Sequence, residues 1–192
     1  MVRHIYIVED EERLLDEAYR ELQVLYDIHL QADRQGEIQE KREFPYRLRR
    51  VDLPHANERK YWNKLEITTN DTVVLDLNFN NYRDIHTREK RVVDFTGKDV
   101  LKVLEAEKRK RSLPGLERVL VATSLPLEVD SANPAAFYVG IQGFDLYGME
   151  KGRDIQGRVI GYGRSLAERL VALYSDFARF DEQPLNEGWR NE

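Results

Sequence analysis

The sequence of 192 residues contains no cysteine. This absence excludes a disulfide-stabilised scaffold, a thiolate zinc site and a cysteine nucleophile, and it favours a reducing compartment. The sequence also lacks any apolar run close to the roughly 20 residues that a membrane helix requires. The amino terminus turns acidic after Val8, so it has neither the apolar stretch nor the cleavage site of a signal peptide. We therefore expect a soluble, cytoplasmic protein that has no membrane partner.

An excess of positive charge is also lacking. The net charge is −5, which argues against a general nucleic-acid-binding surface. The length is close to the roughly 150 residues that are typical of one domain, so we predict a single domain over residues 1–181. A polar tail is expected at 182–192. The stretch at about 34–70 does not follow a strand-helix rhythm and predicts an insertion, in which residues 46–53 alternate enough to form an extra strand.

Short apolar runs rich in β-branched residues predict the buried strands of a parallel sheet. The three clearest runs are residues 4–8, 72–75 and 119–122. A fourth strand is expected nearer the sheet edge at 26–32, and a fifth within 137–147. The sequence thus predicts a sheet whose central strands are better defined than its edges.

Helical patterns separate these runs. Apolar residues recur at helical spacing over 14–25 and again over 166–177. Thr96 and Asp99 have the spacing of a capping box and open a helix that closes in the basic run 108–111. Strands alternating with helices predict right-handed crossovers and helices on both faces of the sheet.

Polar residues follow the apolar strands where each strand ends. Glu9 and Asp10 follow the strand expected at 4–8, and Asp76 ends the strand at 72–75. Thr123 ends the strand at 119–122, and Lys151 follows the last expected strand. Ligands and substrates bind at the carboxyl ends of strands in such sheets. Clustered carboxylates repel one another, so they favour a hard cation such as Mg²⁺ between them. A metal, a lysine and a hydroxyl could together stabilise a phosphoryl group that arrives on an aspartate.

The segments that carry these residues resemble the receiver domain of two-component response regulators in their order and their local sequence. They are residues 5–11, 71–77, 118–124 and 143–151. The resemblance implies a flavodoxin-like (CheY-like) α/β sandwich of three layers. Its sheet would have five parallel strands in the order 2-1-3-4-5, with the extra residues of this chain as insertions.

The resemblance also implies a role for each residue. Asp76 would accept the phosphoryl group, Thr123 would hydrogen-bond its oxygens, and Lys151 would pair with the phosphate. The implied Mg²⁺ ligands are Glu9, Asp10, Asp76 and the backbone carbonyl of Asn78. The implied partners are a histidine kinase or phosphotransfer protein as donor and a downstream protein as target, with homodimerisation left open.

Two other functions stay open at this point. Gly152 follows Lys151 where the family has a proline, and the chain carries long insertions, so a degenerate receiver that is never phosphorylated is the first alternative. A haloacid-dehalogenase-like phosphatase is the second, because those enzymes also use an aspartate after an apolar strand. They need a second aspartate two positions later as general acid, where this chain has Asn78, which disfavours turnover chemistry.

Overall fold

The central sheet has five parallel strands. The computed structural model describes residues 3–33, 46–79, 82–83, 90–123, 138 and 140–174. The strands in chain order are β1 (Arg3–Val8), β2 (Tyr46–Arg50), β3 (Thr72–Asp76), β6 (Arg118–Thr123) and β7 (Asp145–Glu150). They are arranged as β2-β1-β3-β6-β7 with every pairing parallel. Counted along the chain this is the order 2-1-3-4-5, so the predicted flavodoxin-like topology is confirmed.

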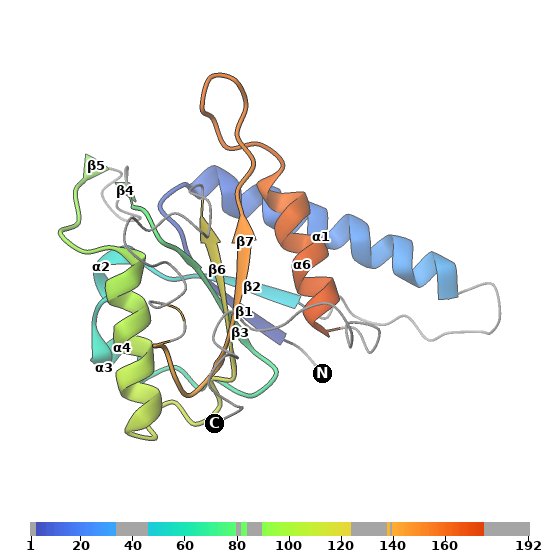
Figure 1. Cartoon of the computed structure of the whole chain (residues 1–192). Helices are drawn as coiled ribbons and strands as arrows, with labels where there is room; N and C mark the ends of the chain where they lie inside the picture. The colour runs from blue at the N-terminus through green and yellow to red at the C-terminus, as the bar shows by residue number, and fades with distance from the viewer. Residues whose placement is uncertain are drawn as a thin grey trace.

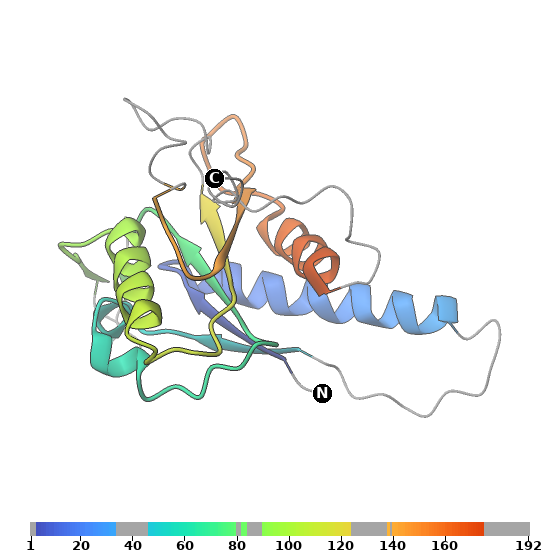
Figure 2. The same cartoon turned by 60° about the horizontal axis from the view of Figure 1, so that its bottom comes forward.

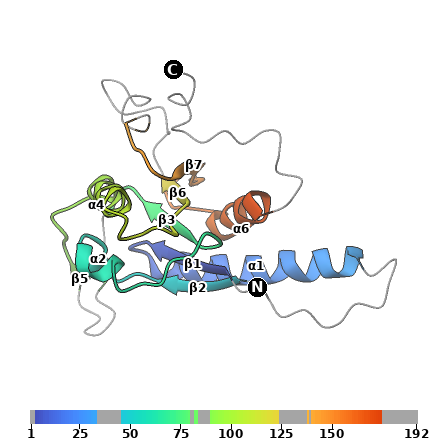
Figure 3. The ribbon, with the colours of Figure 1, turned by 90° about the horizontal axis from the view of Figure 1, so that it is seen from below.

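Helices cover both faces of this sheet (Figures 1 and 3). One face carries α1 (Glu12–Asp33) and α6 (Tyr162–Tyr174); the other carries α4 (Gly97–Arg109) and the short helices α2 (Leu53–Ala56) and α3 (Arg59–Trp62). Side chains alternate along each strand. In β1, Ile5 and Ile7 therefore face α1 and α6, whereas Tyr6 and Val8 pack in the core under α4. None of the described helices combines the length and the hydropathy of a membrane span.

The strand predicted at residues 26–32 is wrong, because this segment continues helix α1. No glycine or proline occurs between residues 12 and 33, so nothing in the sequence stops the helix after its buried face at Leu14, Ala18 and Leu22. The short alternating pattern in this segment is compatible with either structure.

The edge strand comes instead from the predicted insertion. β2 pairs with β1 and lies within residues 46–53, where we expected an extra strand. The stretch 34–70 is therefore not wholly an insertion, since it supplies part of the main sheet. Its residues 34–45, like the tail at 182–192, lie outside the described residues.

The other boundaries differ less. The fifth strand, β7, overlaps the predicted range 137–147 only at its end and runs on to Glu150, directly before Lys151. The capping box of α4 is confirmed, because the Asp99 carboxylate accepts a hydrogen bond from the Thr96 backbone N–H at 2.9 Å. A small antiparallel hairpin of β4 (Tyr82–Arg83) and β5 (Lys90–Arg91) lies between β3 and α4.

Gly97 lets α4 start against the end of β3. A Cβ atom at this position would lie 2.0 Å from the Asp76 carbonyl oxygen and 2.7 Å from the Leu77 Cα atom. Both are backbone atoms, which cannot move aside without shifting the strand that carries Asp76. The glycine therefore sets the distance between helix α4 and the carboxyl end of β3.

We predict that Gly97→Ala lowers the free energy of unfolding by about 3 kcal/mol, because the added methyl group overpacks a backbone contact. Lys102→Ala, on the exposed side of the same helix, should change it by less than about 0.5 kcal/mol. Urea unfolding of both variants measures the difference. Equal stability of the two would contradict the close approach.

Candidate functional site

The predicted polar residues converge at the carboxyl edge, meaning the side of the sheet at which β1, β3, β6 and β7 end. The β7 register places Thr123 beside Glu150, directly before Lys151, and Asp76 pairs with Ala122 on β6. In Figure 1 the arrowheads of β6 and β7 point to this edge. Five side chains gathered here are buried: Glu9, Asp10, Asp76, Thr123 and Lys151.

The Lys151 ammonium joins two of the acids. Its Nζ donates to Glu9 Oε2 at 2.6 Å and to Asp76 Oδ2 at 2.8 Å. The three side chains come from positions 142 and 75 residues apart along the chain. Buried charged side chains occur in proteins mainly when they are paired and hydrogen-bonded, and this ion-pair arrangement meets that condition.

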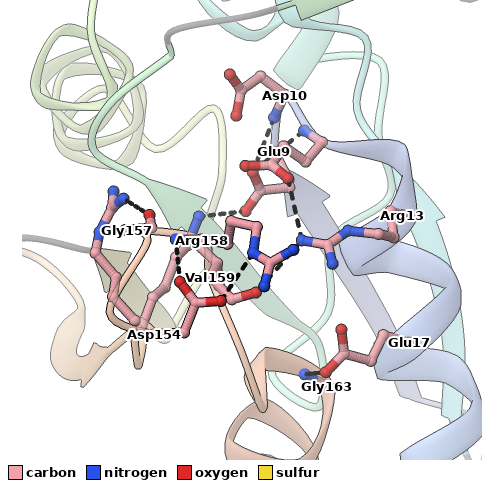
Figure 4. Close-up of polar contacts among 12 residues, drawn as sticks. Glu9, Asp10, Arg13, Glu17, Asp154, Gly157, Arg158, Val159 and Gly163 are labelled. Atoms are coloured by element: carbon pink, nitrogen blue, oxygen red, sulfur yellow. Dashed lines mark hydrogen bonds and ion pairs between the residues drawn. The ribbon is translucent and has the colours of Figure 1, made fainter.

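The second oxygen of each paired acid is held by the backbone. Glu9 Oε1 accepts hydrogen bonds from the backbone N–H groups of Asp10 at 3.1 Å and Glu11 at 3.3 Å. Figure 4 shows Glu9 and Asp10 at the junction of β1 and α1. Asp76 Oδ1 accepts from the backbone N–H of Asn78 at 3.2 Å. These bonds fix the direction of both carboxylates relative to the strands.

The acids are close enough to share a metal ion. Among the residues that the structure describes, Glu9, Asp10 and Asp76 each offer a carboxylate oxygen, and these oxygens lie within 4.8 Å of one another. Lys151 contacts two of these carboxylates, and Asp10 adds a third beside them. Buried carboxylate oxygens at this spacing fit a hard divalent cation such as Mg²⁺.

Burial of these groups changes the acidity of the site. Burial raises the pKa of Glu9 to about 8; the Lys151 ammonium opposes this rise and the Asp76 carboxylate adds to it. Burial also raises the pKa of Asp76, again opposed by Lys151. Burial opposes the charge of Lys151, but Glu9 and Asp76 outweigh it and raise the lysine pKa. Without a metal ion, Glu9 therefore holds a proton more tightly in the folded protein than an ordinary glutamate does.

The remaining predicted residues lie around this cluster. Thr123 is buried at the end of β6, and its backbone carbonyl accepts a hydrogen bond from the Lys151 N–H at 2.6 Å. Asn78 is half-buried two residues after Asp76. The roles of the Thr123 hydroxyl and the Asn78 carbonyl remain predictions.

Tyr162 belongs to the site although no sequence motif indicates it. Its buried ring lies under the Lys151 ammonium, with 5.1 Å between Nζ and the ring centroid. The two residues are separated by a loop that follows β7. The conformation of this loop, which sequence patterns do not encode, brings the Tyr162 ring next to Lys151.

We predict that the metal-free protein loses stability as the pH rises from about 4.5 to about 8. These are the pKa values of Glu9 in the unfolded chain and in the folded protein. The folded state binds this proton more tightly, so the stabilisation is complete at low pH and disappears through this window. The loss should be on the order of 5 kcal/mol. Thermal or urea unfolding in a chelating buffer at several pH values measures it.

Glu9→Gln is the matched variant, because it keeps the shape of the side chain and removes the titration. Its unfolding free energy should vary much less between pH 5 and pH 8, where ordinary carboxyl groups are already ionised. An undiminished slope in the variant would show that another group causes the pH dependence.

No protein-family model matches the sequence, and no curated protein matches it. Three solved structures are similar to it. A response regulator receiver domain from Rhodospirillum rubrum is 14% identical with a TM-score of 0.47, covering 96% of this chain and 99% of that chain.

The other two similar structures are CheY-like receiver domains. The one from Methanospirillum hungatei is 17% identical with a TM-score of 0.45, covering 88% of this chain and 91% of that chain. The one from Methylobacillus flagellatus is 17% identical with a TM-score of 0.40, covering 82% and 92% respectively. The fold itself is established by the strand order of the sheet, which is that of flavodoxin-like, CheY-like proteins.

Proposed function

We propose that the chain is a receiver module that accepts a phosphoryl group on Asp76 in the presence of Mg²⁺ and acts through protein contacts. The observation that carries this proposal is the cluster of three buried carboxylates at the carboxyl edge, two of which, Glu9 and Asp76, are paired with the Lys151 ammonium. Burial and the neighbouring charges perturb the pKa values of Glu9 and Asp76 in this cluster. Perturbed pKa values of this kind are typical of functional sites.

Asp76 is the acid best suited to accept the group. It ends the central strand β3, and one of its oxygens is held by the Asn78 backbone while the other contacts Lys151. An Asp76 oxygen forms the new bond to phosphorus as the bond from phosphorus to the donor nitrogen breaks, and the leaving imidazole takes up a proton. The donor is then a phosphohistidine of a kinase or phosphotransfer protein.

The surrounding groups stabilise the charge of the phosphoryl oxygens. Lys151 turns from the Asp76 carboxylate to the phosphate, and the Thr123 hydroxyl donates a hydrogen bond to it. Mg²⁺ would be held by Glu9, Asp10, Asp76 and the Asn78 carbonyl. When bound, it supplies electrostatic neutralisation of the phosphoryl oxygens.

We predict that incubation with acetyl phosphate and Mg²⁺ adds one phosphoryl group to the chain, and that Asp76→Asn abolishes the addition. Intact-mass spectrometry measures the adduct, which should be lost at alkaline pH as an acyl phosphate. Asp145→Asn is the matched control, because Asp145 starts β7 at the opposite edge of the sheet. This variant should be modified like the wild type.

The other outcomes separate the competing functions. A folded wild type that forms no adduct would indicate a receiver that works without phosphorylation. An adduct that persists in Asp76→Asn would place the acceptor elsewhere. Release of phosphate from a phosphate ester over many turnovers would favour a phosphatase.

A further inference from the structure

We propose that Tyr162 is a positioning residue that holds the Lys151 ammonium at the site through the face of its ring. This inference deepens the proposed function, and its part in phosphoryl transfer rests on that function. The contact between the ring and the ammonium, however, is a property of the folded chain alone and can be tested separately.

The ammonium has three described neighbours. Glu9 and Asp76 accept its hydrogen bonds, and the Tyr162 ring lies beneath it at 5.1 Å. A cation within about 6 Å of an aromatic centroid is attracted by the ring, most strongly where water is excluded. Lys151 and Tyr162 are both buried, so the contact has the desolvated setting in which this attraction is largest.

Tyr162 is itself fixed by the packing of α6 against α1. A Cβ on Gly163 would lie 2.5 Å from the Glu17 carbonyl carbon, and the Gly163 N–H donates to Glu17 Oε1 at 3.1 Å. Figure 4 shows this contact, and Figure 2 shows the two helices side by side. Gly161, with φ of +64°, makes the turn into α6. The ring therefore has a defined position, which a flexible lysine side chain does not have by itself.

The ring face, and not the hydroxyl, makes this contact. No described residue forms a hydrogen bond with the Tyr162 hydroxyl, which is buried. A phenylalanine can therefore replace the tyrosine without loss of a described hydrogen bond. A leucine fills part of the space but has no π face.

The ring also has a place in the reaction sequence of the site. Phosphorylation would convert the Asp76 carboxylate into an acyl phosphate, and the ammonium would lose the partner that it now contacts at 2.8 Å. The Tyr162 ring is chemically unchanged by that event. It can keep the ammonium at the carboxyl edge while the lysine transfers its hydrogen bond to the phosphoryl oxygens.

The test compares Tyr162→Phe and Tyr162→Leu, each alone and combined with Lys151→Gln. We expect the rate of adduct formation from acetyl phosphate to stay within about twofold for the phenylalanine variant and to fall about tenfold for the leucine variant. In the Lys151→Gln background the leucine substitution should cause no further decrease, because the ring then has no ammonium to hold. Equal decreases in both backgrounds would show a purely structural role and overturn the inference.

Tyr6→Leu is the matched control. Tyr6 is a buried tyrosine in the core on the opposite face of the sheet, so this variant loses a similar packing contact. Its adduct rate, measured on protein that remains folded, should exceed that of Tyr162→Leu. Equal loss in the two variants would attribute the effect to general destabilisation.

NMR tests the contact without any phosphorylation and without a variant that must fold. The ring current of the aromatic side chain at position 162 should shift the ε-methylene protons of Lys151 upfield, both in the wild type and in Tyr162→Phe. Unshifted protons in the wild type would overturn the inference whatever the adduct assay gives. A wild type that shows the shift but forms no adduct would support the positioning contact and refute the proposed function.

Discussion

The arrangement at the carboxyl edge depends on three clustered buried carboxylates, of which Glu9 and Asp76 contact the Lys151 ammonium. Taking charges out of water is costly, and a buried ion pair rarely repays that cost as stability. Hydrogen bonds from the backbone and from Lys151 hold Glu9 and Asp76 in place. The site therefore gathers oxygen donors of the kind that a hard divalent cation prefers.

The parallel sheet makes this concentration of charge possible. Parallel strands end at the same edge, so residues that follow β1, β3 and β7 meet although long segments separate them in the sequence. Apolar cores on both faces hold the strands. Helix α4 lies against β3 at Gly97, and α6 lies against α1 at Gly163. The two glycines thus connect helix packing on each face to the positions of Asp76 and Tyr162.

The sequence predicts the centre of this structure better than its edges. β1, β3 and β6 are continuous apolar runs that end in polar residues, and this pattern alone predicts Glu9, Asp76 and Thr123 at one edge of the sheet. The prediction of the edge strand fails for two reasons. The short alternating segment at 26–32 fits a helix equally well, and the strand that forms the edge, β2, is rich in arginine. Tyr162 is missed because its contact with Lys151 depends on the path of a loop, which no periodic pattern records.

The central claim is that Glu9, Asp10 and Asp76 form one cation site next to the phosphoryl acceptor. The most direct measurement is a crystal structure of the protein with Mg²⁺ and beryllium trifluoride, which mimics a phosphoryl group. We predict one Mg²⁺ ligated by carboxylates of this cluster, with the beryllium on an Asp76 oxygen and Lys151 in contact with a fluorine atom. A fully bound ion elsewhere, or acids that point away from one another with Asp76 unmodified, would contradict the claim.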